Sequence, residues 1–134
     1  YGVLLDSHGH LDMEASAVHR AELRRRRCAS PGPRPDGPAP LAPFTEYLML
    51  GEIQGQVVTF CGRCRRVFGP AQENYKRYAL VAEYPLSRGG PFQDNPHFVL
   101  REYCCPGCAT LLEVEVNLKG SPLRWDVRLA PTLQ

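Results

Sequence analysis

The alternation of apolar and polar residues predicts that the C-terminal part of the chain forms mostly β-strands. The clearest segment is 112–116, where Glu113 and Glu115 alternate with leucine and valine. Strict alternation places the apolar side chains on a buried face and both glutamates in water. Residues 44–50 fit a helix and a strand equally well. Segments rich in β-branched and aromatic residues, bounded by glycine, proline or asparagine, predict strands at 56–60, 75–84, 97–103, 110–116 and 124–129.

The N-terminal part predicts a short extended segment over 1–5, a turn over 7–10 and a helix over 13–27. Asp12 is a suitable N-cap for this helix, and the four arginines 24–27 lie at the end where the helix dipole favours positive charge. A lone helix of this length is marginally stable in water, so we expect it to dock on a partner outside this sequence.

A proline-rich stretch separates the two parts. Proline fixes φ and removes an amide donor, so residues 30–43 are expected to form an extended spacer rather than a helix or a sheet. The expected organisation is therefore an N-terminal tail over 1–29, a linker over 30–43 and a domain over 44–134. The prolines that define the linker are Pro31, Pro33, Pro35, Pro38, Pro40 and Pro43.

Composition narrows the class of protein. The chain has 134 residues and a net charge of +2, which disfavours a dedicated nucleic-acid or membrane-surface protein. No apolar run approaches the roughly 18 residues of a membrane span, and the start lacks the apolar stretch of a secretory signal. We therefore expect a cytoplasmic location. Because the first residue is Tyr1 rather than methionine, we expect the tail of a longer chain or a processed product.

Four of the six cysteines form two Cys-x-x-Cys pairs, Cys61 with Cys64 and Cys105 with Cys108. Each pair can form a tight turn, here called a knuckle, that presents two sulfurs to one ion. Two knuckles supply the four thiolates of a closed, structural Zn²⁺ site. The predicted fold class is therefore mainly β: a small zinc-ribbon-like antiparallel domain preceded by a helix and a proline-rich linker.

Other assignments of the cysteines remain open. A redox dithiol at Cys61 and Cys64 would need a surrounding βαβ pattern, which the sequence lacks, and it would leave the second pair idle. An iron centre of the rubredoxin type uses the same four ligands as zinc. Cys104 points away from its neighbour Cys105 in an extended segment and is expected to be a small buried residue, whereas Cys28 is expected to be a free thiol.

Several weaker patterns in the sequence have simpler explanations than a functional site. His8 and His10 are better explained by a polar turn than by a surface metal site. Arg63, Arg65 and Arg66 beside the first knuckle suggest a zinc ribbon that binds nucleic acid, which remains the alternative function. The sequence has no Gly-rich phosphate loop and no G-x-S-x-G motif. A closed zinc site activates no water, so the chain alone is expected to be non-catalytic.

Residues 74–81, 99–108 and 110–116 resemble the γ subunit of acetone carboxylase and acetophenone carboxylase. The most specific part is 100–116, and the likeness extends loosely over 57–130. Ala109 departs from the glycine that is typical of the family. The resemblance implies a small zinc-binding subunit, with Cys61, Cys64, Cys105 and Cys108 as ligands. It also implies an ATP-dependent, biotin-independent carboxylase complex that joins bicarbonate to a ketone.

Residues 1–27 show a second resemblance, to the extreme C-terminus of large subunits of the hydantoinase B and oxoprolinase type. Together the two resemblances imply a large-subunit tail fused to a γ-like domain, because a tether raises the effective concentration of a small partner. The partners expected are the large α and β subunits that carry the nucleotide and substrate chemistry. The expected function is that of an accessory component of a ketone carboxylase, which is a ligase complex.

Overall fold

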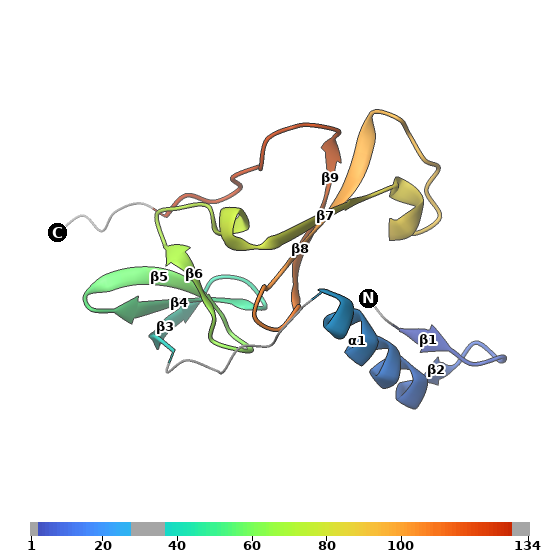
Figure 1. Ribbon diagram of the computed structural model, residues 1–134, viewed down its shortest axis with the longest axis horizontal. Helices are drawn as coiled ribbons and strands as arrows, with labels where there is room; N and C mark the ends of the chain where they lie inside the picture. Colours follow the sequence, from blue (N-terminus) through green and yellow to red (C-terminus); the bar gives the residue numbers. More distant parts are fainter. Residues whose placement is uncertain (1–2, 28–36, 130–134) are drawn as a thin grey trace.

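The computed structural model describes residues 3–27 and 37–129, which form antiparallel sheets and one long helix near the N-terminus (Figure 1). The mainly β, zinc-ribbon-like fold class predicted from the sequence is confirmed. The N-terminal segment contains β1 (Leu4–Leu5), β2 (Leu11–Asp12) and α1 (Met13–Arg27). The second sheet has the order β3 (Ala39–Pro43), β4 (Leu48–Ile53), β5 (Gln56–Cys61) and β6 (Val67–Pro70). The third has the order β7 (Leu80–Tyr84), β8 (Phe98–Cys104) and β9 (Leu111–Leu118), and the 3₁₀ turns are η1 (Tyr75–Tyr78) and η2 (Leu86–Gly89).

The helix α1 has the predicted bounds and the predicted cap. Asp12 Oδ1 accepts a hydrogen bond from the Ala15 amide at 2.8 Å, which satisfies one of the free donors of the first turn. The fully buried Ser16 hydroxyl accepts from the Leu4 amide at 2.8 Å, so it joins the helix to β1. The helix therefore packs on its own small hairpin.

The prediction that the whole linker avoids sheet structure is wrong for its end. Residues 39–43 form β3, which pairs antiparallel with β4. Prolines are tolerated there because β3 is an edge strand, and the register shifts between Pro40 and Ala42. The Arg65 guanidinium also donates to the carbonyl oxygens of Gly37 and Pro38, which ties the start of β3 to the first knuckle.

Two predicted strands are corrected by the structure. The segment 75–84 begins with η1, because the Asn74 side chain accepts from the Lys76 amide at 3.1 Å and caps a 3₁₀ turn; only Leu80–Tyr84 is a strand. Residues 124–129 form no strand. They belong to an irregular segment, 121–129, here called the strap. The strap is held by hydrogen bonds from Arg101 to the Ser121 carbonyl, at 3.1 Å, and from Asn74 to the Arg124 carbonyl, at 3.0 Å.

The hydrophobic core lies beside the two knuckles. Its buried members are Leu48, Cys61, Phe68, Tyr75 and Cys105. The Tyr75 ring makes edge-to-face contacts with the rings of Phe68 and Phe44, with centroids 6.3 and 6.4 Å apart. Because two of the five core residues are cysteines, the core positions the cysteine cluster. Among the described residues, no helix is long and apolar enough to cross a membrane.

Candidate metal centre

The first knuckle connects β5 to β6. The Arg65 amide donates to the Cys61 carbonyl at 2.8 Å, and the Cys61 amide donates to the Arg66 carbonyl at 2.8 Å. These two bonds close a tight turn around Cys61 and Cys64. Arg65, directly after the second cysteine, has a φ of 63°. A non-glycine residue in the left-handed region is uncommon, and here it reverses the chain within one turn.

The second knuckle, between β8 and β9, repeats this backbone pattern. The Ala109 amide donates to the Cys105 carbonyl at 2.8 Å, and the Cys105 amide donates to the Thr110 carbonyl at 2.9 Å. Ala109 has a φ of 53°, which matches the position of Arg65 in the first knuckle. The two knuckles are therefore equivalent turns that present their sulfurs from two different sheets.

The structure brings all four sulfurs of the predicted ligands together, within 4.8 Å of one another. Cys61 Sγ lies 3.8 Å from Cys108 Sγ, and Cys64 Sγ lies 3.5 Å from Cys105 Sγ. A tetrahedral site with metal–sulfur bonds of about 2.3 Å has sulfur–sulfur edges of about 3.8 Å. A disulfide would need about 2.05 Å. The four cysteines are free thiols arranged at the spacing of a tetrahedral metal site.

The acidities of these thiols show why a cation suits the cluster. Hydrogen bonding from the Cys105 side chain, together with backbone amides of the knuckle, lowers the pKa of Cys61 to about 5. The same hydrogen bond and burial raise the pKa of Cys105 well above its usual value, and burial raises that of Cys64 to about 11. One thiolate therefore suppresses ionisation of its neighbours. A divalent cation at the centre removes this conflict, because it stabilises all four thiolates.

Other groups around the sulfurs fit a structural metal site. The Gly107 amide donates to Cys105 Sγ at 3.3 Å, and the Thr110 hydroxyl lies 3.1 Å from Cys108 Sγ. A side chain at Gly107 would place its Cβ 3.0 Å from Cys64 Sγ, so only glycine fits there without displacing the sulfur. Donors aimed at thiolates are the usual outer support of such a centre.

Cys104 and Cys28 are the two cysteines outside the predicted ligand set. Cys104 is 4% exposed, as expected for a small buried residue, and among the described residues its sulfur is outside the cluster. Cys28 lies outside the described residues.

The residues of the weaker patterns are also placed. The Arg65 guanidinium donates hydrogen bonds to the carbonyl oxygens of Gly37 and Pro38. Arg63 and Arg66 are exposed beside the first knuckle. His8 and His10 are exposed in a turn in which Asp6 Oδ1 accepts from both of their amides. The predicted polar turn accounts for both histidines.

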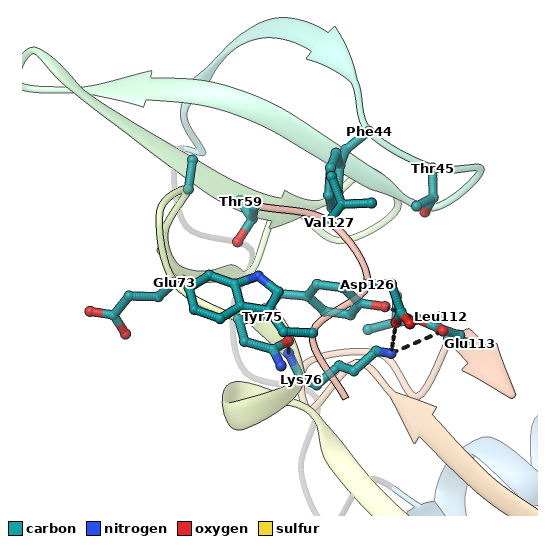
Figure 2. A pocket seen from close by; sticks show the side chains of 13 residues that line it. Phe44, Thr45, Thr59, Glu73, Tyr75, Lys76, Leu112, Glu113, Asp126 and Val127 are labelled. Atoms are coloured by element: carbon teal, nitrogen blue, oxygen red, sulfur yellow. Dashed lines mark hydrogen bonds and ion pairs between the residues drawn. The ribbon is translucent and has the colours of Figure 1, made fainter. Parts of the chain in front are cut away.

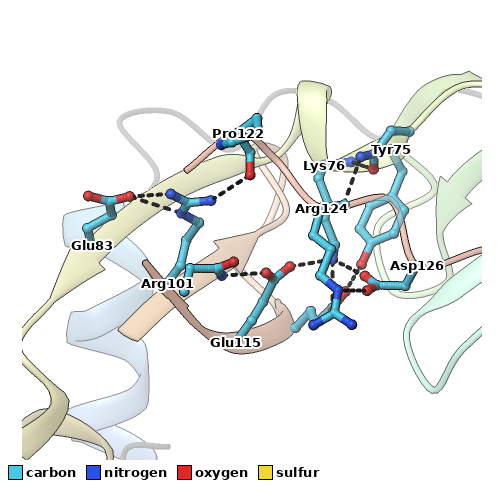
Figure 3. A network of polar contacts seen from close by, with 11 residues as sticks. Tyr75, Lys76, Glu83, Arg101, Glu115, Pro122, Arg124 and Asp126 are labelled. Carbon is cyan, nitrogen blue, oxygen red and sulfur yellow. Dashed lines mark hydrogen bonds and ion pairs between the residues drawn. The ribbon is translucent and has the colours of Figure 1, made fainter. Parts of the chain in front are cut away.

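The prediction that Glu113 and Glu115 face water is wrong. Lys76, whose side chain is 1% exposed, donates to Glu113 at 3.0 Å, and also to Glu115 and Asp126 (Figure 3). The Glu115 side chain is only 10% exposed. Burial alone would raise the pKa of Glu115, but the hydrogen bonds from Lys76 outweigh burial and lower it. The charged face of β9 is therefore an interior face, and Val116 on the other face is 56% exposed.

Sequence reasoning missed this network, although a signal for it exists. Arg101 in β8 pairs in register with Glu115 in β9 and with Glu83 in β7, and its guanidinium donates to Glu83 at 2.6 Å. A row of alternating charge across three strands indicates that one face of the sheet is occupied by ion pairs rather than solvent.

A small cavity of about 240 Å³ opens above this network (Figure 2). Phe44 and Val127 lie on one side of the cavity, Tyr75 and Lys76 on the other. The Tyr75 hydroxyl donates to Glu113, and Lys76 is committed to three carboxylates. The polar groups at its base already bind one another, so the cysteine cluster is the stronger candidate site.

Two comparisons with known proteins agree with each other. Residues 43–131 match the sequence profile of the family described as acetone carboxylase gamma subunit. The chain is also 32% identical over 95 residues to the acetophenone carboxylase beta subunit of Aromatoleum aromaticum (strain DSM 19018 / LMG 30748 / EbN1). That similarity covers 64% of this chain and 72% of the relative. The matched segment contains both knuckles and all three strands of the third sheet.

Proposed function

Because the chain belongs to the acetone carboxylase gamma subunit family, we propose that it is a zinc-binding accessory subunit or domain of a ketone carboxylase complex. The observation that carries this proposal is the cluster of four free thiols at tetrahedral spacing. Cys61, Cys64, Cys105 and Cys108 would hold the ion. Zinc at this position would join the end of β5 to the end of β8, and so would connect the second sheet to the third.

The metal has a structural role in this proposal. Four thiolates fill the coordination sphere of zinc, so no position remains for a water molecule or a substrate. The chain's own residues exclude solvent from two of the sulfurs, because Cys61 and Cys105 are completely buried, whereas Cys64 and Cys108 are half-buried. Catalysis therefore belongs to the large subunits, and this chain organises them.

The resemblances in the sequence supply the finer features of the proposal. The complex would carry out ATP-dependent, biotin-independent carboxylation in the cytoplasm. The chain would dock on large subunits of the hydantoinase and oxoprolinase type. The family match begins at residue 43, so the resemblance of residues 1–27 to a large-subunit tail stays a prediction. Arg65 is already bound within the chain, and this disfavours the alternative of a nucleic-acid-binding zinc ribbon.

Elemental analysis of the purified chain tests the metal. We expect one zinc per chain, and we expect Cys61→Ser to lose it. Iron in place of zinc, or full metal content in the variant, would contradict the proposed centre. Copurification with co-expressed large carboxylase subunits tests the assembly. A zinc-loaded chain that captures none of them would refute the accessory role and leave the metal site intact.

A further inference from the structure

The third sheet has one apolar face that stays largely open. Cross-strand pairing places Phe98 beside Leu118 and Leu100 beside Val116. Leu100 is buried, but Phe98 is 39% exposed, Leu118 55% and Val116 56%. We call this surface the apolar face, defined by Leu80, Phe98, Leu100, Val114, Val116 and Leu118. Isolated exposed apolar residues are normal, whereas a contiguous row along two paired strands marks an interaction surface.

The opposite face of the same sheet is already covered. Arg101, Tyr103 and Glu115 lie on that side, where Lys76 and the strap pack over them. An antiparallel sheet commonly packs one face on the core and exposes a polar face to water. Here the exposed face is apolar instead, which is typical of a surface that a partner covers.

A groove of about 1250 Å³ lies over the apolar face. Leu100, Val114 and Val116 line it from the sheet, and Phe92, 61% exposed, lines it from the loop between β7 and β8. Ala17 and other residues of α1 line it from the helix. A helix is about 10–12 Å wide and rises about 1.5 Å per residue, so this volume matches about eight to ten helical residues.

The groove is edged by positive charge. Arg20 and Arg24 of α1 and Arg63 of the first knuckle line it, and within residues 3–27 and 37–129 none of the three has a carboxylate at ion-pair distance. The lining carboxylates of Glu102 and Glu113 already pair, with Arg88 at 3.6 Å and with Lys76 at 3.0 Å. Among the described residues that line the groove, Glu46 is the one carboxylate outside these ion pairs.

We propose that this groove binds a short amphipathic helix of a partner subunit, with apolar residues toward the sheet and acidic residues toward the arginines. The proposal rests on the proposed function, since the partner is one of the large carboxylase subunits. A helix of about two to three turns fills the groove, covers the exposed apolar side chains and brings carboxylates to guanidinium groups that have no carboxylate partner among the described residues. Charge selects the partner, and the apolar contact supplies most of the affinity.

The test uses the full zinc-loaded chain and two labelled 14-residue peptides. Both carry leucine at helical spacing; one carries glutamate on its flanks and the other carries lysine. By fluorescence anisotropy, we expect the glutamate peptide to bind at least tenfold more tightly, with an affinity that falls as salt rises. Equal affinity for the two peptides, or no binding of either, would overturn the proposal.

Substitutions locate the site. Val116→Asp on the apolar face is expected to weaken peptide binding at least tenfold. The matched control is Val81→Asp, which lies on the opposite face at 43% exposure and should bind normally. Arg24→Glu combined with Arg63→Glu should shift the preference toward the lysine peptide. A loss in Val81→Asp equal to that in Val116→Asp would place binding elsewhere and sink the assignment.

Two further outcomes separate this inference from the proposed function. If large subunits copurify equally well with Val116→Asp and with the parent chain, the groove assignment fails and the accessory role stands. If the parent chain captures none, the accessory role fails whatever the peptides do. Sedimentation of the chain alone gives the last comparison: a dimer that Val116→Asp converts to monomer would show that a second copy covers the apolar face, and would overturn the proposal.

Discussion

The buried side chain of Lys76 forms ion pairs that connect η1 to β9 and to the strap. Its ammonium group is enclosed by three carboxylates, and its Nζ lies 5.1 Å from the centroid of the Tyr103 ring. Burial would lower the pKa of Lys76, but hydrogen bonds with Asp126, Glu115 and Glu113 outweigh burial and raise it. Hydrogen bonding to Lys76 lowers the pKa of Asp126. Lys76, Glu115 and Asp126 therefore stay ionised through the neutral range.

Lys76→Met should introduce a pH dependence of stability between pH 7 and pH 5. In the parent chain, the lowered pKa values of Glu115 and Asp126 stabilise the fold above their ordinary range near 4, and the raised Lys76 pKa stabilises it below about 10.5. The contribution of these ion pairs to stability should thus be nearly flat from pH 5 to 9. The variant leaves carboxylates buried without a cation, which costs about 3–5 kcal/mol at pH 7. Protonation relieves this cost, so the variant should gain stability as pH falls from 7 to 5 in urea titrations.

The matched control is Lys119→Met, because Lys119 is exposed and should tolerate the change with an unaltered pH profile. A Lys76→Met variant whose unfolding midpoint is as insensitive to pH as that of the parent chain would show that the three carboxylates do not depend on the ammonium group.

A second prediction at this scale concerns the turn between β4 and β5. Gln54 and Gly55 form a two-residue loop with φ values of 52° and 78°. Both values are positive, as in the type I′ turn that asparagine followed by glycine favours. Gln54→Asn should therefore raise the free energy of unfolding by about 0.5–1 kcal/mol, measured by thermal unfolding. Gln93→Asn, in an exposed loop without positive φ, is the control and should change nothing. A lower melting temperature for Gln54→Asn would contradict the turn assignment.

The residues differ in how far their roles were predictable. The spacing of the cysteines is a local pattern, because each knuckle is closed by hydrogen bonds within six residues. The role of Glu115 is not local, since its partner Lys76 is 39 positions away in the chain. Alternation along β9 correctly separates two faces, but it does not tell which face is interior when the interior is charged. The assignment of Val116 to the buried face failed for this reason, whereas Leu112 does pack against the core.

At the scale of elements, the strap is the least regular part that contributes to stability. It has no backbone ladder, and side chains hold it: Arg101 at Ser121, Asn74 at Arg124 and Lys76 at Asp126. Its residues 124–129 have the composition of a strand, yet tertiary contacts override this propensity. The proline-rich β3 shows the converse, since a segment of poor propensity becomes a strand when an edge is available beside β4.

Asp126→Asn should loosen the strap without unfolding the sheets. Trp125 is the single tryptophan of the chain and lies in the strap at 38% exposure, so its emission reports strap release. We expect a red shift and faster proteolysis near 121–129. The parent chain should show the same red shift only in acid, as pH falls through the lowered Asp126 pKa. Asp94→Asn, a carboxylate that caps the Ser87 amide in a different loop, should leave the emission unchanged. An unshifted spectrum for Asp126→Asn would mean that the hydrogen bonds from Arg101 and Asn74 hold the strap without the ion pair.

At the scale of the whole molecule, the cysteine cluster joins two sheets that few other interactions connect. Cys61 ends β5 in the second sheet, and Cys105 follows β8 in the third. The apolar cluster packed around them is small, with five buried members among the described residues. Small cores of this kind commonly depend on a metal for stability. Spacing alone predicted the four sulfurs, but not the edge contacts and polar network that complete the join.

Cys105→Ser should therefore unfold the two larger sheets and spare the N-terminal segment. Structural zinc contributes about 10–16 kcal/mol of binding free energy, as much as the whole stability of a typical domain. The bonds that hold α1, from the Ala15 amide to Asp12 and from the Leu4 amide to Ser16, lie entirely within the N-terminal segment. Hydrogen exchange should become fast over 80–118 in the variant and stay at its parent rate over 13–27. Cys104→Ala is the neighbouring control and should keep its metal, because that sulfur lies outside the cluster. Protection of 80–118 in the Cys105→Ser variant would show that packing, not metal, connects the sheets.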